Sequence, residues 1–105
     1  MSKLVNYTNE ILGEDDAFQG SYRGSIGHTF GHLVLSKKKL MFLREGSIGG
    51  AEFETRFDIP YSDLNYDILD RNLMEIKDAT GNSWQINTAM MAKFVEVRLK
   101  ELCGK

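Results

Sequence analysis

One stretch of the sequence, residues 32–45 (HLVLSKKKLMFLRE), constrains the fold of this chain more than any other. It holds two apolar runs, Leu33–Leu35 and Leu40–Leu43, which are separated by the polar residues 36–39. Two short apolar runs around a short polar break are typical of a β-hairpin. Because side chains alternate between the two faces of a strand, the second run presents large apolar side chains on both faces. A hairpin of this kind must be covered twice by the rest of the chain.

The beginning of the chain offers one of these covers. Residues 3–12 (KLVNYTNEIL) are predicted to form a short helix. Its apolar residues are Leu4, Val5, Ile11 and Leu12. Either this segment packs on the second face of the hairpin or another copy of the chain does, because a bare apolar patch is unusual on a soluble monomer.

Alternation of apolar and polar residues predicts further strands on both sides of the hairpin. The clearest is 52–59 (EFETRFDI), whose phenylalanines and isoleucine are predicted to face the core. Before the hairpin, residues 17–25 form a predicted strand with Phe18 and Tyr22 on one face. Three later strands are centred on residues 64–68, 74–76 and 84–86.

Near residue 88 the period of the apolar residues changes from two residues, typical of a strand, to about 3.6 residues, typical of an α-helix. This change predicts a C-terminal helix. Asn87 or Thr88 is its predicted N-cap. One apolar stripe runs along it, formed by Met91, Phe94, Val95, Leu99 and Leu102. Such a stripe must be buried against the strands. We therefore predict one core that contains Trp84, Phe53, Phe57, Phe94 and Leu99.

The order of these elements predicts a mainly β fold with one C-terminal helix. Seven strands with short connections pair antiparallel. They form a partly open barrel or two orthogonal sheets, which the amphipathic helix plugs. Residues 1–16 are an N-terminal segment with a short helix, and residues 17–105 form the domain.

Three segments of the chain resemble the pleckstrin-homology (PH) superfamily, and within it the GRAM and bacterial PH-like groups. Residues 31–43 (GHLVLSKKKLMFL) are similar to a hairpin of the form Gly-x-Leu-x-Leu-Thr-x-x-Arg-Leu-x-Phe, with Ser36 for the threonine and Lys39 for the arginine. Residues 57–69 (FDIPYSDLNYDIL) resemble an Ile-Pro-x-x-Asp-Ile junction, and residues 73–86 (LMEIKDATGNSWQI) a Leu-x-Ile-x-x-x-x-Gly hairpin. The similarity covers about residues 17–102 and implies a PH-like fold.

The resemblance implies a non-catalytic binding module, commonly for protein partners or phospholipid headgroups. The preferred prediction is protein binding or self-association, because of the doubly apolar hairpin. The alternative is weak binding to an anionic phospholipid surface through Lys37, Lys38 and Lys39. Phosphoinositide-binding members of the family carry basic residues on the first two strands and the loop between them, whereas here residues 25–31 contain no Lys or Arg and only Arg23 precedes them.

Composition narrows the classes of function. The net charge of −2 argues against a nucleic-acid partner. No apolar run reaches the roughly 20 residues of a transmembrane helix, and the first residues lack the apolar core of a signal peptide. The single cysteine fits a cytoplasmic protein, with peripheral association with a membrane as the alternative.

Four groups of residues could in principle support catalysis or metal binding, and each has a simpler structural explanation. The acidic run 14–16 is predicted to be a solvated turn rather than a metal site. His28 and His32 lack an evident third zinc ligand. Cys103 is predicted to pack, and Asp67 with Asp70 to shape a turn. We predict no enzyme activity, no cofactor and no bound metal.

A tetrapeptide that occurs twice supplies the predicted partner-binding or ligand-binding residues. Gly24-Ser25-Ile26-Gly27 and Gly46-Ser47-Ile48-Gly49 are identical. Both are predicted to be loops at the same end of the barrel, which is where ligands commonly bind in the resembling family. The predicted site residues are Arg23, Ser25, Ile26, Ser47 and Ile48. They suit an apolar contact through the isoleucines or an anion held by backbone N–H groups. Of these two functions we favour the apolar contact, and the alternative is that both segments are simply flexible connections.

Overall fold

The computed structural model of the protein describes residues 3–46 and 53–103. In these residues the chain forms seven strands, two α-helices and one 3-10 helix. In chain order they are α1 (Lys3–Leu12), β1 (Phe18–Ile26), β2 (Thr29–Ser36), β3 (Lys39–Glu45), β4 (Phe53–Pro60), η1 (Tyr61–Asp63), β5 (Asn65–Asp70), β6 (Leu73–Lys77), β7 (Ser83–Thr88) and α2 (Ala92–Cys103).

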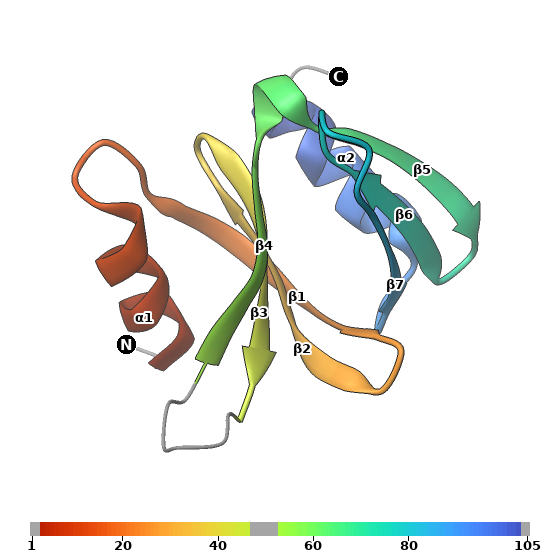
Figure 1. Ribbon diagram of the computed structural model, residues 1–105, viewed down its shortest axis with the longest axis horizontal. Coiled ribbons are helices and arrows are strands. Elements are labelled where there is room, and N and C mark those ends of the chain that lie inside the picture. The colour runs from red at the N-terminus through yellow and green to blue at the C-terminus, as the bar shows by residue number, and fades with distance from the viewer. Residues whose placement is uncertain (1–2, 47–52, 104–105) are drawn as a thin grey trace.

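The strands make one antiparallel sheet in the order β4-β3-β2-β1-β7-β6-β5. β1 joins its two halves, because β1 pairs with β2 along most of its length and with β7 only at Gly24 and Ser25. The sheet folds over, and its two edges, β4 and β5, are connected by η1 (Figure 1). The predicted fold class, an open antiparallel barrel with a C-terminal helix, is confirmed.

Tyr61 of η1 fastens the junction between β4 and β5 to the β2–β3 hairpin. Its backbone N–H donates to the carbonyl of Lys38 at 3.0 Å, and its phenol donates to the carbonyl of Ser36 at 2.6 Å. Burial raises the pKa of the Tyr61 phenol, so the group stays protonated and remains a donor.

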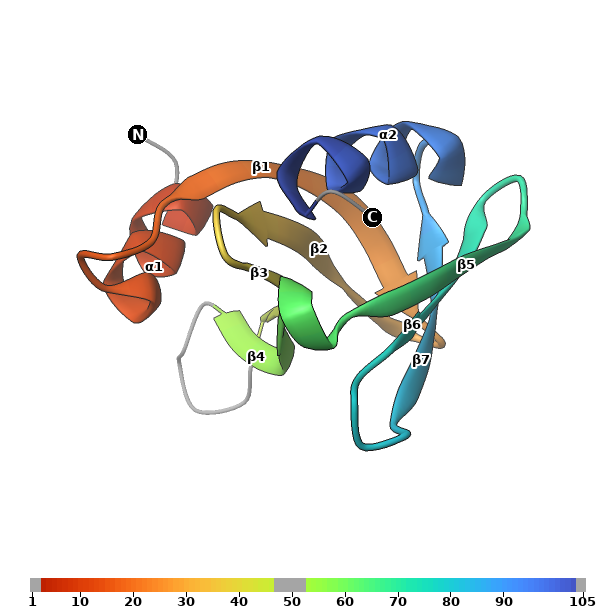
Figure 2. The ribbon, with the colours of Figure 1, turned by 90° about the horizontal axis from the view of Figure 1, so that it is seen from above.

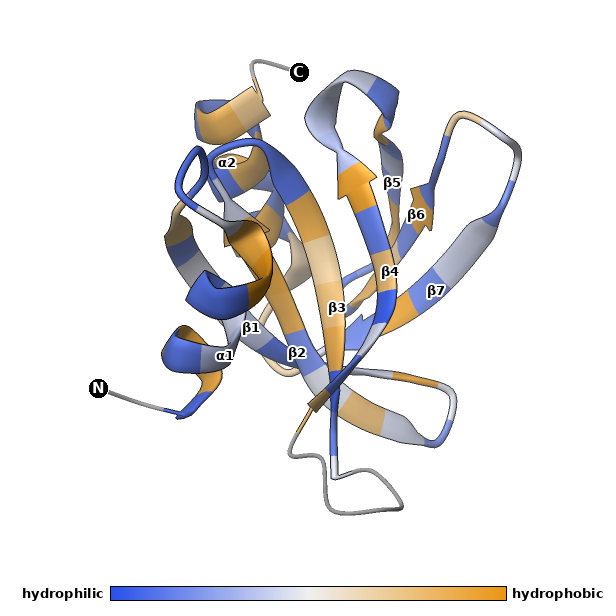
Figure 3. Cartoon of the chain, turned by 60° about the vertical axis from the view of Figure 1, so that its left-hand side comes forward, coloured by the Kyte–Doolittle hydropathy of each residue, from blue (hydrophilic) through white to orange (hydrophobic). Residues whose placement is uncertain are grey.

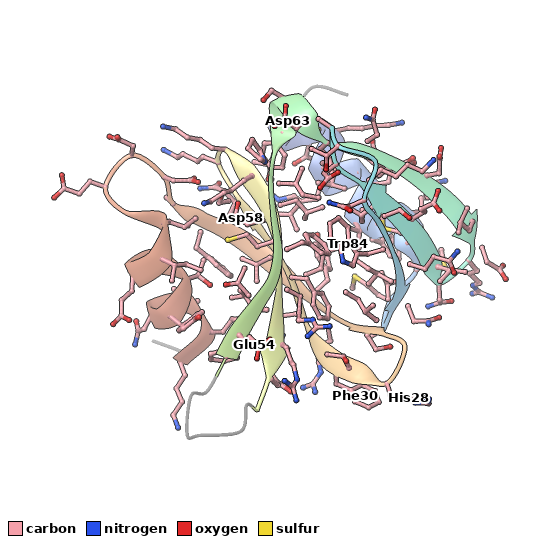
Figure 4. The ribbon with its side chains drawn as sticks, viewed as in Figure 1. His28, Phe30, Glu54, Asp58, Asp63 and Trp84 are labelled. Atoms are coloured by element: carbon pink, nitrogen blue, oxygen red, sulfur yellow. The ribbon has the colours of Figure 1, made fainter. Side chains whose placement is uncertain are left out.

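α2 covers the inner face of the folded sheet and completes the main core (Figure 2). Phe57 of β4 and Trp84 of β7 meet across this core with ring centroids 4.7 Å apart, and Trp84 lies between the two halves of the sheet in Figure 4. The fully buried residues of this core come from both halves: Leu33, Leu35, Leu40, Phe42, Leu64, Met74, Ile76, Ile86, Ala92, Val95 and Leu99.

The residues of α2 that face the core are not all those predicted, because the helix is rotated about its axis relative to the prediction. Ala92, Val95 and Leu99 are buried, whereas Phe94 is 53% exposed, so the predicted burial of Phe94 is wrong. The helix also begins later than predicted, because Asn87 and Thr88 still belong to β7. The backbone N–H of Ala92 donates to the carbonyl of Arg71 at 2.8 Å, which ties the start of the helix to the β5–β6 turn.

α1 provides the second cover of the hairpin. The outer face of β2, β3 and β4 forms a separate apolar cluster of Val34, Met41, Leu43 and Phe53. Leu4, Tyr7 and Leu12 of α1 pack on it, and Tyr7 and Phe53 have ring centroids 5.4 Å apart. Figure 3 shows α1 lying over β2 and β3, the latter apolar along most of its length. The two helices therefore lie on opposite sides of the β2–β3 hairpin (Figures 1 and 2).

Two β-bulges decide which side chains reach this outer cluster. In β4 the pairing shifts between Phe42↔Phe57 and Leu43↔Thr55, which turns Phe53 to the outer face. A similar shift in β1, between Phe18 and Gly20, turns Phe18 outward while Tyr22 packs on the main core. An extra residue in a strand reverses the face of everything beyond it. The predictions that Phe53 shares the core of Phe57, and that Phe18 shares a face with Tyr22, are therefore wrong.

Two paired glycines allow the sharp bend where the halves of the sheet meet. Gly24 of β1 pairs with Gly31 of β2. A Cβ at Gly24 would lie 2.8 Å from the carbonyl oxygen of Asn87, and one at Gly31 would overlap the carbonyl oxygen of Leu43. Neighbouring backbones come too close at this corner for any side chain.

Changing Gly31 to alanine should destabilise the fold much more than changing Gly20, which lies on the same β1–β2 ladder. The added methyl of Gly31→Ala must displace backbone, at a cost of about 1–3 kcal/mol. Nothing lies within 4 Å of a Cβ at Gly20, so Gly20→Ala should be nearly neutral. Thermal melting of both variants measures the difference, at about 4–8 °C for each kcal/mol. Equal melting temperatures would refute this account of the corner.

Alanine substitutions on α2 should separate its two faces. Leu99→Ala leaves a cavity in the main core and should cost about 2–5 kcal/mol. Phe94→Ala removes a half-exposed ring and should cost less than about 1 kcal/mol. Chemical denaturation of the two variants gives the comparison. A larger loss for Phe94→Ala would mean that the helix is rotated from the orientation described here.

Candidate functional site

The predicted loop residues of the first tetrapeptide lie in a strand. Gly24, Ser25 and Ile26 are the last residues of β1, and the turn that follows is formed by Gly27 and His28. Ile26 is half-buried and packs against the main core rather than projecting from a loop. The predicted exposed contact through Ile26 is therefore wrong in its geometry. Ser47 and Ile48 of the second tetrapeptide lie outside the described residues.

Arg23 and Ser25 do line a hollow, which we call the corner pocket. It lies where β2, β1 and the end of β7 meet and has a volume of about 350 Å³. Its lining residues are Arg23, Gly24, Ser25, Phe30, Gly31, Asn87, Thr88 and Ala89. The pocket exists because the sheet bends at the two glycines.

Phe30 is the most unusual residue of this pocket. Its side chain is 68% exposed, and Figure 4 shows it projecting beside His28 at the β1–β2 end of the molecule. Ser25 pairs with Phe30 on one side and with Asn87 on the other, so these three residues form a row across the outer face. A ring left in water beside a hollow is a candidate contact residue. Phe30 was not among the predicted site residues, although an aromatic residue next to a predicted turn was a usable signal.

The polar groups of the corner pocket differ in their exposure. The side chain of Arg23 is 69% exposed and approaches Glu45 only at 3.7 Å. The Oγ1 atom of Thr88 is buried without a hydrogen-bond partner among the described residues. The pocket thus combines an apolar ring, a cation and small hydroxyl groups.

The two histidines do not form a metal site in the part of the chain that is described. His28 lies in the β1–β2 turn, whereas the Nε2 atom of His32 is 2.6 Å from a carboxylate oxygen of Glu45. The His32 ring also lies edge-on to Phe53, with centroids 6.2 Å apart. Residues 3–46 and 53–103 contain no group of three potential ligands. His32 therefore acts as a link between the outer cluster and Glu45.

The lysine turn is tied to the acidic segment before β1. Asp16 accepts hydrogen bonds from the Ser36 hydroxyl at 2.8 Å and from the Lys38 backbone N–H at 3.2 Å. Lys39 donates to Asp58 at 2.9 Å, and Asp15 lines the same hollow as Lys38 and Lys39. The three lysines thus share their surface with three aspartates, which weakens any attraction to anionic lipid.

Removing these aspartate charges should strengthen binding to anionic lipid relative to the unchanged protein. Asp15→Asn combined with Asp58→Asn leaves Lys38 and Lys39 uncompensated without touching the hydrogen bonds of Asp16. Each uncompensated lysine near an anionic surface is worth about 1 kcal/mol. Sedimentation with phosphatidylserine–phosphatidylcholine vesicles should show stronger, salt-sensitive binding of the double variant. Equally strong binding of the unchanged protein would mean that the aspartates do not neutralise the turn.

The remaining residues that were considered for catalysis or metal binding are Cys103, Asp67 and Asp70. Cys103 is half-buried at the end of α2 and packs against the main core. Asp70 accepts a hydrogen bond from the N–H of Arg71 in the β5–β6 turn, whereas Asp67 lies within β5 opposite Glu75. The expected pair of turn aspartates is thus correct for Asp70 only.

A second apolar surface lies on the outside of α2. Phe94 and Val97 are 53% and 48% exposed, and Met90, just before the helix, is 43% exposed. With Tyr22 of β1 and the paired side chains of Arg98 and Glu101 they line a hollow of about 530 Å³. We call Met90, Phe94 and Val97 the outer stripe of α2. Their spacing of four and three residues was visible in the sequence, but only one apolar stripe was assigned to the helix.

In the described part of the chain, neither helix has the length and apolar character needed to cross a membrane.

No protein-family model matches the sequence, and no curated protein matches it. Among solved structures, a pleckstrin homology domain from Shewanella amazonensis SB2B is similar, with a TM-score of 0.63 and 14% sequence identity. The match covers 99% of this chain and 98% of that chain. The chain therefore has a PH-like fold, as the sequence resemblance implied, and at this identity the likeness shows the fold alone.

Proposed function

We propose that this chain is a non-catalytic protein-interaction module that binds a protein partner at the corner pocket. Within the PH-like fold, the sequence patterns support a place in the GRAM and bacterial PH-like groups. A PH-like fold supports a binding role in general, and a cytoplasmic location is part of the same proposal. The observation that carries the choice of site is Phe30, an exposed aromatic ring at a concave corner of the sheet.

The lining of the pocket suggests the chemistry of the partner. Gly24 and Gly31 line the pocket with backbone atoms alone. Phe30 offers a ring face to an apolar side chain, and aromatic residues are frequent energetic centres of interfaces. Arg23 lies on the same outer face and can pair with a carboxylate. The expected partner therefore presents a large apolar side chain next to an aspartate or a glutamate.

Binding to acidic phospholipid is the less favoured function. The lysine turn lies at the opposite end of the β1–β2–β3 ladder from Phe30, and its lysines are matched by Asp15, Asp16 and Asp58. An exposed ring beside one arginine suits a protein surface better than a headgroup that carries several negative charges.

Selection of peptides from a random display library tests the proposal. Peptides that bind the unchanged protein should combine a large apolar residue with a nearby acidic residue. Fluorescence polarisation should show that Phe30→Ser weakens their binding about tenfold or more, as expected for a central aromatic contact. Arg23→Ala should weaken binding less and reduce its dependence on salt.

Leu69→Ser is the matched control. Leu69 is 47% exposed on β5, far along the sheet order from the corner pocket, and its loss should leave peptide binding unchanged. Neither surface substitution should change the melting temperature by more than a few degrees. If the selected peptides bind Phe30→Ser as tightly as the unchanged protein, the corner pocket is not the site.

A further inference from the structure

The outer stripe of α2 needs an explanation that the corner pocket does not supply. α2 already buries Ala92, Val95 and Leu99 against the sheet. A surface helix of a small domain ordinarily has one apolar face, and its opposite face is polar. Here the opposite face carries Phe94 and Val97, both about half exposed, with Met90 beside them. α2 is thus apolar on two sides, and one side lacks a cover in the described residues.

The charges around this stripe are arranged so that a second α2 can face it in the opposite direction. Val97 lies midway between Lys93 and Glu101, four residues from each. If two antiparallel helices cross at Val97, Lys93 of each copy lies at the level of Glu101 of the other, about 6 Å along the axis from the crossing point. Both residues are exposed, so two symmetric ion pairs can form. An antiparallel arrangement also sets each helix N-terminus beside the C-terminus of the other, which their dipoles favour.

We infer that the outer stripe of α2 is a contact between two copies of this chain, which pack their α2 helices antiparallel around a two-fold axis at Val97. The apolar centre of the contact is Val97 with Phe94, and Tyr22 of β1 lines the same hollow. Arg98 is held at the rim by Glu101 at 2.8 Å and by the carbonyl of Gln19 at 3.3 Å. This contact is separate from the corner pocket, so it stands or falls independently of the proposed partner binding.

The small size of the stripe predicts a weak dimer. Stable interfaces bury about 800 Å² on each partner, whereas three half-exposed side chains and a tyrosine supply much less. We therefore expect a monomer–dimer equilibrium with a dissociation constant in the micromolar to millimolar range, visible by analytical ultracentrifugation over a wide range of concentration.

The first experiment places a charge at the symmetry axis. Val97→Glu sets two carboxylates against each other in the dimer and should leave only monomer at every concentration. Leu69→Glu, an equally exposed substitution on β5, is the control and should dimerise like the unchanged protein. A monomeric unchanged protein at all concentrations, or a dimer that survives Val97→Glu, overturns the inference.

The second experiment tests the antiparallel register without touching an apolar residue. Lys93→Glu alone and Glu101→Lys alone put like charges at the same level, and each should weaken self-association about threefold or more. Mixing these two variants restores opposite charges at both ends, so the mixture should associate more tightly than either variant alone. The double variant should likewise dimerise more tightly than Glu101→Lys, which lacks the same pair with Arg98. A mixture no tighter than its components excludes this register and overturns the inference.

Discussion

The hairpin of β2 and β3 buries side chains on both of its faces, and the rest of the molecule is arranged to cover it twice. On the inner side, Leu33 and Phe42 lie in the main core under the second half of the sheet and α2. On the outer side, Val34 and Met41 lie under α1. A two-stranded hairpin is marginal by itself, so its stability depends on both covers. The corner at Gly24 and Gly31 follows from the first of them, because the sheet must bend sharply there to fold over the hairpin.

Much of the fold could be predicted from alternation and spacing. A buried face requires an apolar residue at every second position of a strand and at about every 3.6 positions of a helix. These periods predicted the hairpin, the other strands and the C-terminal helix. The faces of Phe18 and Phe53 could not be predicted, because one extra residue in a strand leaves the apolar pattern intact and reverses its direction. The side of α2 that faces the core was also ambiguous, since Phe94 and Val95 are neighbours in the sequence and only Val95 is buried.

The candidate site was less accessible to sequence reasoning than the fold. Arg23 and Ser25 were identified, but Ser25 as part of a loop and Arg23 as the residue before it, rather than as the wall of a pocket in a paired strand. Phe30 carries the proposed function, yet in the sequence it is one of several aromatic residues in strands. Its exposure results from its position at the end of β2 on the outer face, beyond the reach of α1. Only the register with Ser25 and Asn87 brings it to the pocket.

Asp16 has a consequence for how the molecule moves. One carboxylate accepts from the hydroxyl of Ser36 and from the N–H of Lys38, and the carbonyl of Ala17 accepts from Lys37. The segment that leads from α1 into β1 therefore also holds the β2–β3 turn. If α1 leaves the outer cluster and takes residues 16 and 17 with it, the amides of Lys37 and Lys38 lose these two acceptors, and the Ser36 hydroxyl remains as an acceptor for Lys38 and Lys39. The helix and the turn thus form one cooperative unit of local opening, whose amides exchange with solvent together and before those of the main core.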